Sequence, residues 1–199
     1  MATTSAGLRE RKKERTRQLL ADVALDLFET RGFDHTTVDD IAAAADVSPR
    51  TFFRYFAAKD EAVFDRAADV EQHFRALLAS RPTDEPLLVS LNEIGKDLLA
   101  HDLVDERRVR RLLALVHHEP ALRSRYDGLM AMIEAELTTW AAARLGVPPT
   151  DLRPRLLAAA VLAARRVATD VWLESPGDDL ADHVRRAIDL LAAGLTDGA

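Results

Sequence analysis

Apolar residues recur at spacings of three and four along nearly the whole chain, and this periodicity constrains the fold more than any other feature. One such stripe, early in the chain, consists of Leu20, Val23, Ala24, Leu27 and Phe28. Strict alternation of polar and apolar residues, which marks a half-buried strand, is absent, and the strong helix formers Ala and Leu dominate. The sequence therefore predicts an all-α fold.

Glycines, prolines and short polar runs divide this pattern into nine predicted helices. The first covers residues 8–30 and ends at Gly32, which can take the left-handed conformation of a helix cap. Two short helices follow, and Thr37 and Ser48 are suited to cap their N-termini. The other six are expected at residues 59–80, 87–101, 106–117, 121–145, 153–173 and 178–195.

Composition excludes several classes of protein. No run approaches the roughly 18 uncharged residues of a membrane-spanning helix, so no membrane partner is expected, and the first residues lack the apolar segment of a signal peptide. The absence of cysteine excludes disulfides and fits a reducing cytosol, and we expect a cytoplasmic protein. Although the net charge is −6, residues 9–17 hold six cations and two carboxylates. This segment is either a solvated helix face or a phosphate-binding arm.

The two short helices carry clear start signals. Asp40 can answer Thr37 in a shortened capping box, and Pro49 fits the first helical position after Ser48. Only Asp46 and Val47 separate the helices, a connection that suits two short helices crossing steeply.

The second of these helices is unusually aromatic. Phe52 and Phe56, four residues apart, share one face and are predicted to lie in the core. The residues predicted to project outward are Arg50, Thr51, Phe53 and Arg54. In a DNA major groove, arginine can donate two bonds to guanine and an aromatic ring can touch the thymine methyl. The alternative is a core corner with stray aromatic exposure.

The block from Thr16 to Phe64 closely resembles the DNA-binding domain of the TetR family of bacterial one-component regulators. The matching elements are "LFETRGFDHTTVDDIAAAADVS" and "FRYFAAKDEAVF", of which Tyr55-Phe56 followed by Lys59 is the most specific part. Asp46 stands where the family usually has glycine. Because aspartate tolerates the left-handed conformation better than most residues, we expect the turn to survive.

The resemblance implies a nine-helix architecture with two domains. Residues 1–60 would form a three-helix helix-turn-helix domain, including a basic N-terminal arm at 1–17, and residues 61–199 an effector-binding and dimerisation domain. The implied DNA-binding residues are Thr37, Ser48, Pro49, Arg50, Thr51, Phe53, Arg54, Tyr55 and Lys59. Among them Arg50 and Thr51 are the favoured base readers, with Phe53 as an apolar reader. The expected phosphate contacts are Tyr55, Lys59 and Thr37.

Dimerisation is expected because one such helix touches few base pairs, whereas two half-sites related by a twofold axis give specificity. The partner is then double-stranded DNA with a palindromic operator. The last two helices, 153–173 and 178–195, are the predicted homodimer interface. The first offers Ala158, Ala159, Ala160 and Ala163 for close approach, and the second offers Val184, Ile188, Leu191 and Leu195. Burial of these helices inside their own subunit is the alternative.

The resemblance also implies an effector pocket in the C-terminal domain. Apolar candidates to line it are Phe64, Phe74, Ile94, Leu98, Leu112, Met130, Ile133, Leu137, Trp140 and Trp172. Residues 117–146 loosely resemble actinobacterial members of the family that respond to long-chain acyl-CoA, which suggests a small hydrophobic effector, acyl-CoA-like molecules included. Arg165 and Arg166 would either meet an anionic effector or, as we favour, pair with acids across the dimer.

The predicted function is a homodimeric, ligand-responsive repressor without a cofactor. A regulator controlled by a protein partner, or an activator, is the nearest alternative. An enzyme built on a helical bundle is disfavoured, because the sequence offers no catalytic triad, phosphate loop or paired Glu-x-x-His motif. No metal site is predicted, since His117 and His118 would point in different directions on a helix.

Overall fold

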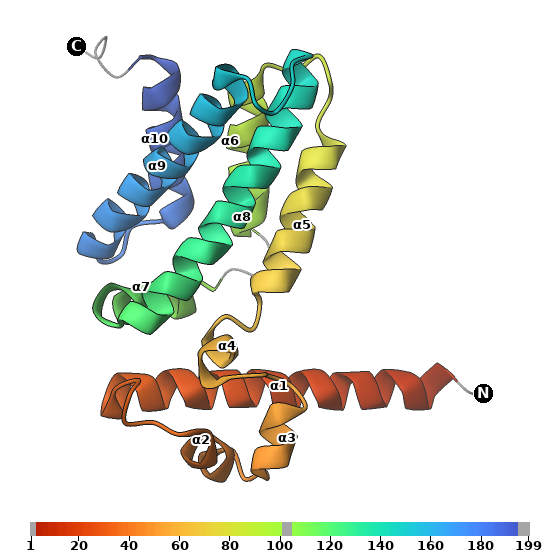
Figure 1. Cartoon of the computed structure of the whole chain (residues 1–199), viewed down its shortest axis with the longest axis vertical. Helices are drawn as coiled ribbons and strands as arrows, with labels where there is room; N and C mark the ends of the chain where they lie inside the picture. The colour runs from red at the N-terminus through yellow and green to blue at the C-terminus, as the bar shows by residue number, and fades with distance from the viewer. Residues whose placement is uncertain (1–2, 101–104, 195–199) are drawn as a thin grey trace. The chain divides into compact units, whose positions relative to one another are not determined.

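The computed structural model describes residues 3–100 and 105–194, and within these ranges the chain forms ten helices and no strand (Figure 1). It divides into two compact units. The N-terminal unit contains residues 1–67 and 111–125, and the C-terminal unit contains 68–110 and 126–199. The first unit thus adds a segment from mid-chain to the predicted DNA-binding region.

The N-terminal unit is built on one long helix, α1 (Thr3–Arg31), with three short helices: α2 (Val38–Ala44), α3 (Pro49–Phe53) and α4 (Lys59–Val63). α1 packs against α2 and α4, and α2 packs against α3 (Figure 1). α1 begins at Thr3 rather than at the predicted Leu8, and the basic segment at residues 9–17 forms its helical extension beyond the three short helices. Residues 1–2 of the predicted arm lie outside the described residues.

Two predicted left-handed positions are confirmed in this unit. Gly32 ends α1 with φ of 85°, and its N–H donates to the carbonyl of Phe28 at 3.0 Å. Asp46 has φ of 53° in the turn between α2 and α3. Asp46 therefore takes the left-handed conformation that this turn requires. A glycine would take the same conformation with less strain.

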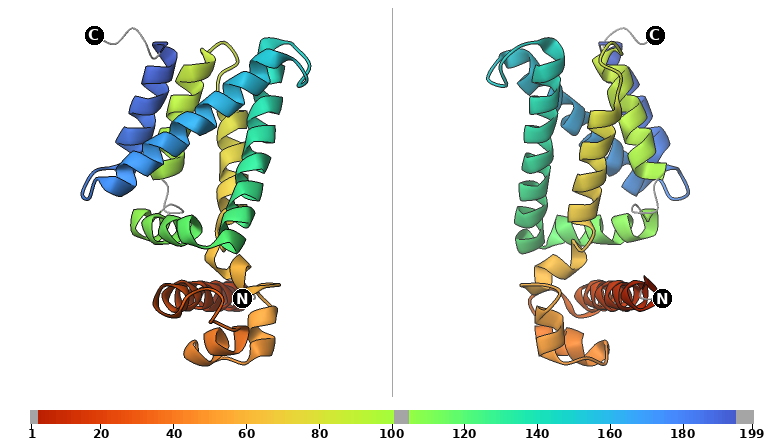
Figure 2. Two further views of the ribbon diagram at one scale, coloured as in Figure 1. Left: turned by 60° about the vertical axis from the view of Figure 1, so that its left-hand side comes forward. Right: turned by 90° about the vertical axis from the view of Figure 1, so that its right-hand side faces the viewer.

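The C-terminal unit takes most of its mass from six helices: α5 (Ala67–Ser80), α6 (Leu87–Ala100), α7 (Glu106–His118), α8 (Pro120–Leu145), α9 (Leu152–Glu174) and α10 (Leu180–Ala192). α10 packs against both α9 and α6 (Figure 2). α7 from Arg111 onward and the start of α8 up to Arg125 belong to the N-terminal unit, so both helices are shared between the units. The predicted helix ends at His101 and Leu195 lie outside the described residues.

The prediction of one helix at 59–80 was wrong, because α4 and α5 are separate. Turn bonds from Phe64 N to Glu61 O and from Ala67 N to Phe64 O replace the helical ladder. The four consecutive residues 62–65 are all buried. Successive residues on a helix point about 100° apart, so four in a row cannot share one face of a straight helix. The break allows all four to be buried.

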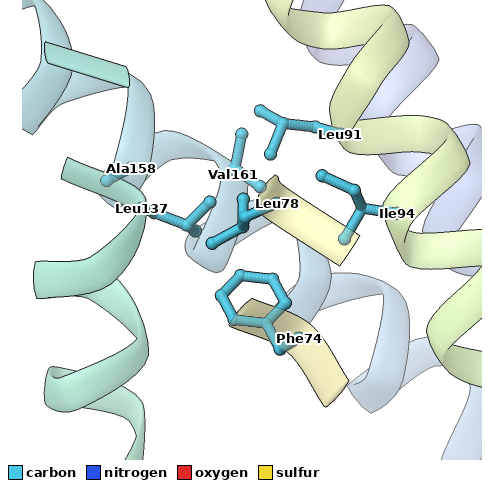
Figure 3. Close-up of a cluster of buried hydrophobic side chains, with 7 residues drawn as sticks. All are labelled: Phe74, Leu78, Leu91, Ile94, Leu137, Ala158 and Val161. Atoms are coloured by element: carbon cyan, nitrogen blue, oxygen red, sulfur yellow. The ribbon is translucent and has the colours of Figure 1, made fainter. Parts of the chain in front are cut away.

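Two apolar clusters form the core of the C-terminal unit. The first cluster draws its buried members from α5, α6, α8 and α9: Phe74, Leu78, Leu91, Ile94, Leu137, Ala158 and Val161 (Figure 3). The second cluster joins α9 to α10 through Ala168, Trp172, Leu180, Val184 and Ile188. α9 therefore contributes its inward face to both clusters.

The two clusters take up apolar residues of α10 that were predicted for the homodimer interface. Val184 and Ile188 are buried within their own subunit, and Leu191 packs against the first cluster. Leu195, the fourth predicted residue, lies outside the described residues. These apolar positions therefore bind α10 to its own bundle, and a part for α10 in the homodimer interface stays a prediction.

Candidate nucleic-acid interface

The aromatic residues of α3 divide between core and surface as predicted. Phe52 is 0% exposed and Phe56 is 4% exposed, and their ring centroids lie 5.5 Å apart. Phe53 is 57% exposed and touches the core only through an edge-to-face contact with Phe52 at 5.7 Å. The buried pair fixes the rotation of α3, and that rotation sets which side chains project outward.

The outward face of α3 presents cationic and aromatic groups together. Arg50 is exposed and makes no hydrogen bond or ion pair within the described part of the chain. Arg54 is exposed, and its guanidinium donates to the Tyr55 hydroxyl at 3.4 Å and lies 5.0 Å from that ring's centroid. Beside Phe53, these groups have the chemistry required to read base edges and bind phosphates.

Ser48 and Thr51 are committed to the start of α3. The Ser48 hydroxyl oxygen accepts from the Thr51 N–H at 3.2 Å, and the two hydroxyl oxygens lie 3.0 Å apart. Pro49 occupies the first turn. Thr51 is half-buried, so its hydroxyl would have to leave Ser48 to bond a base. Its role as a base reader remains a prediction, and Arg50 is the less constrained of the two.

Thr37 and Asp40 form the predicted capping box at the start of α2. The Thr37 hydroxyl accepts from the Asp40 N–H at 3.1 Å, and an Asp40 carboxylate oxygen accepts from the Thr37 N–H at 2.9 Å. The Thr37 hydroxyl also donates to this carboxylate, and its bond, with that from the Thr37 N–H, holds the pKa of Asp40 below its ordinary value. Asp40 therefore supports this helix start at neutral pH, and its support is lost as acid protonates the carboxyl. A phosphate at Thr37 would compete with this carboxylate.

Lys59 is tied to the loop that precedes α2. Its ammonium donates to the carbonyls of Phe33 at 2.6 Å and Thr36 at 2.9 Å, and lies 4.1 Å from the centroid of the Phe33 ring. One N–H of the ammonium is left for a phosphate. The predicted phosphate contact thus has a structural role as well.

Replacing Lys59 by methionine is expected to lower the free energy of unfolding by about 1.5–3 kcal/mol, because two carbonyls lose a charged donor. Urea denaturation followed by circular dichroism measures this change. Lys96→Met is the matched control, since the Lys96 side chain is exposed and pairs only with Glu93. Equal effects of the two substitutions would contradict the role assigned to Lys59.

Residues from the mid-chain segment bind the helices of the N-terminal unit. Arg111 of α7 pairs with Asp26 and Glu29 of α1, and these acids raise the pKa of its guanidinium. Arg125 of α8 pairs with Asp60 at 3.3 Å and Glu61 at 3.1 Å, both in α4. The sequence did not predict these ion pairs, because their partners lie more than 60 residues apart and form no local sequence pattern.

The predicted pocket residues do not form one lining. Phe74, Ile94 and Leu137 are buried members of the first cluster, against which Leu98, Ile133 and Trp140 pack. Trp172 belongs to the second cluster, and Phe64 and Leu112 belong to the N-terminal unit. Met130 contacts Arg165 instead. Their role in an effector pocket therefore stays a prediction.

The described residues contain no group of three or more His, Asp or Glu side chains close enough to hold a metal ion. His117 and His118 are exposed, and their rings stand at 85° to each other. No helix in the described ranges combines the length and apolar character needed to cross a membrane.

Two family models match the chain. Residues 20–64 match the model described as "Bacterial regulatory proteins, tetR family", and residues 85–196 match the model described as "MftR C-terminal domain". The first model covers α2, α3 and α4, which present the exposed Arg50, Phe53 and Arg54.

Relatives match over nearly the whole chain. The HTH-type transcriptional regulator TcmR of Streptomyces glaucescens is 36% identical over 181 residues, which cover 87% of this chain and 80% of the relative. The "Putative mycofactocin biosynthesis transcriptional regulator MftR" of Mycobacterium tuberculosis is 28% identical over 93% of both chains. Among solved structures, the fold is similar to that of Thermus thermophilus FadR, a transcriptional repressor in complex with lauroyl-CoA. The TM-score is 0.58 at 23% identity, over 92% of this chain and 96% of the other.

Proposed function

The chain belongs to the TetR family of bacterial regulatory proteins, and we propose that it is a cytoplasmic homodimeric repressor that leaves a palindromic operator when a small hydrophobic effector binds. The chain is a transcriptional regulator and not an enzyme. In the proposed division of labour, residues 1–60 bind DNA and residues 61–199 bind the effector and the second subunit.

The observation that carries the DNA-binding role is the exposed face of α3. Arg50, Phe53 and Arg54 project from a helix that is anchored by a fully buried Phe52. An exposed phenylalanine between arginines is costly in water and useful against base edges and methyl groups. The helical extension of α1 adds exposed cations at residues 9–15, which suit phosphate contacts beside the groove.

An apolar stripe on the outer face of α9 supports the dimer. Its exposed residues recur at helical spacing and are Leu152, Leu156, Ala159, Ala163 and Val167. Leu152 is 74% exposed and Leu156 is 62% exposed. A stripe of this length on a helix whose opposite face is already buried marks an interaction surface. The second copy of the chain is its proposed occupant, since two recognition helices are needed to read two half-sites.

The ion pairs of Arg111 and Arg125 support a route for the effector response. Both residues lie on helices that continue into the C-terminal unit. A change in α7 or α8 on effector binding would alter the support of α1 and α4. The effector must prefer the conformation that does not bind DNA, because equal affinity for both conformations would shift nothing. The structure of Thermus thermophilus FadR, whose fold is similar, contains lauroyl-CoA, and on that ground the proposed effector is small and hydrophobic, acyl-CoA-like molecules included.

Selection from a random duplex library by the purified protein at physiological salt tests this function. Recovery of a palindrome with two half-sites is the expected result. The selection is run once without additions and once with cell extract, on protein that is confirmed to be a folded dimer. If neither selection yields a consensus, sequence-specific binding is overturned. Release of the recovered palindrome in the presence of lauroyl-CoA then tests the effector class.

Arg50→Ala is expected to weaken binding to the selected operator by about 1–3 kcal/mol and to leave binding to a random duplex nearly unchanged. The reason is that a base-edge bond discriminates between sequences whereas a phosphate bond does not. Arg15→Ala is the contrasting variant, because Arg15 is exposed on the helical extension of α1. Arg15→Ala should weaken binding to both duplexes equally and reduce the dependence of this binding on salt concentration. Fluorescence anisotropy with both duplexes measures these changes, and equal behaviour of the two variants would contradict the assignment.

A further inference from the structure

Arg165 is half-buried on the inward side of α9. The neighbouring residues on the inward face of this helix are Ala158, Val161, Ala168, Thr169 and Trp172, and all of them are buried. The spacing from Val161 to Arg165 to Ala168 and Trp172 is four, three and four, which keeps Arg165 on their face. It therefore lies on the inward face of α9 where the first apolar cluster gives way to the second.

The partners of this guanidinium are neutral. One nitrogen, Nη2, donates to the Tyr126 hydroxyl at 3.1 Å and to the Met130 sulfur at 2.8 Å, both on α8. No carboxylate of the described chain pairs with it. Three other half-buried arginines of this unit have carboxylate or carbonyl acceptors: Arg81 pairs with Glu85, Arg110 donates to the carbonyls of Trp172 and Leu173, and Arg144 donates to the carbonyl of Glu85. Nη1 of Arg144 is nevertheless a buried nitrogen without a partner among the described residues.

A charge on the inward face of a helix is costly unless an opposite charge accompanies it. Arginine presents a planar fork that matches the two oxygens of a carboxylate or the oxygens of a phosphate. Two of its donor nitrogens, Nε and Nη1, make no hydrogen bond within the described part of the chain. The guanidinium is therefore held in place on one side and has donors left over for an anion.

Pairing with acids across the dimer does not account for this position. The exposed stripe of Leu152, Leu156, Ala159, Ala163 and Val167 lies on the opposite face of α9. The neighbouring Arg166 is exposed and pairs with Asp170 at 3.3 Å. Arg166 is thus a surface residue with its own partner, whereas Arg165 faces the inside of the bundle.

We propose that Arg165 and Tyr126 bind the anionic group, a carboxylate or a phosphate, of an amphipathic small molecule whose apolar body packs along α8. On α8 the face of Tyr126 and Met130 continues to Ile133 and Leu137 of the first cluster, so the surroundings beyond the guanidinium are apolar. The inference rests on the proposed function and deepens it, because it names the chemical class of the effector. Tyr126 also directly follows Arg125, which pairs with α4.

The test uses the full-length protein and its own tryptophans. Trp140 and Trp172 both lie in the C-terminal unit, and their fluorescence reports binding there. The probes are octanoate, laurate, palmitate and dodecyl phosphate, each compared with the alcohol of the same chain length. The acids and the phosphate are expected to bind about 10- to 100-fold more tightly than the matching alcohols, as a charge-assisted hydrogen bond would give.

Arg165→Gln should abolish this preference for anions, and Arg165→Lys, which keeps the charge but not the fork, should retain part of it. Arg166→Gln is the matched control and should bind all probes as the wild type does. Equal affinity of the wild type for acids and alcohols, an undiminished preference in Arg165→Gln, or failure of every anion to bind would overturn the proposal. The comparison of acid with alcohol in the wild type needs no variant, so a misfolded substitution does not affect it.

The outcome can be separated from that of the proposed function. Binding of the selected operator is measured on the same samples by anisotropy. If laurate binds through Arg165 while operator binding stays unchanged, the anion site stands and the effector role fails. If laurate releases the wild type but not Arg165→Gln from the operator, both proposals stand.

Discussion

Phe52→Ala is expected to lower the free energy of unfolding by about 3–5 kcal/mol, enough to unfold much of the N-terminal unit at physiological temperature. Phe52 is 0% exposed, and its ring packs on Phe56 and Phe53 at centroid distances of 5.5 and 5.7 Å. Truncation removes most of the ring's buried surface and leaves a cavity that so short a helix can close only by moving. Urea denaturation followed by circular dichroism measures the change.

The neighbouring Phe53 supplies the matched control for this prediction. It is 57% exposed, so Phe53→Ala should cost about 1 kcal/mol or less, chiefly from the lost edge-to-face contact. The same substitution should weaken operator binding, because the exposed ring is the proposed apolar reader. The two substitutions therefore separate folding from recognition in adjacent residues of the same type. If Phe53→Ala were as destabilising as Phe52→Ala, the orientation assigned to α3 would be wrong.

Leu156→Glu is expected to convert the dimer to a monomer and to weaken operator binding about 100-fold or more. Leu156 lies in the exposed stripe of α9, and a carboxylate at this position would be buried in the apolar interface in both copies. Loss of the second subunit removes the gain from binding two half-sites at once, which ranges from about 10² to 10⁴. Sedimentation velocity measures the oligomeric state, and anisotropy measures the binding.

Two comparisons make this result specific. Val89→Glu introduces the same charge at a residue of α6 that is 48% exposed and lies outside the stripe, so the dimer should persist. A duplex with a single half-site should bind Leu156→Glu and the wild-type monomer equally. A stable Leu156→Glu dimer would exclude the outer face of α9 as the interface.

Much of the recognition helix could be predicted from the sequence because its determinants are local. The Thr37 capping box, the Ser48 cap, the left-handed Gly32 and Asp46, and the burial of Phe52 all depend on residues within four positions of one another. Backbone hydrogen bonding and helical periodicity act over that range. Start signals and the four-residue repeat were therefore sufficient.

Two features of the fold depend on which neighbour covers a given face. The break at Phe64–Arg66 contains no glycine or proline, and the apolar face of α10 has the same pattern whether it meets α6 and α9 or a second subunit. The spacing of apolar residues indicates that a face of a helix is buried. It does not indicate which helix or subunit covers that face. The role of Lys59 was incomplete for a related reason, since its two carbonyl acceptors lie 23 and 26 residues earlier.

The sequence by itself determined the all-α class, the start and rotation of α3, and the family to which that segment belongs, since each depends on contacts along one helix or one turn. Only the tertiary structure decided that α10 packs inward, that Arg111 and Arg125 hold α1 and α4, and that Arg165 stands on the inward face of α9 beside Tyr126. These features join residues that are tens of positions apart. Their energies depend on a geometry that exists only after the helices have packed.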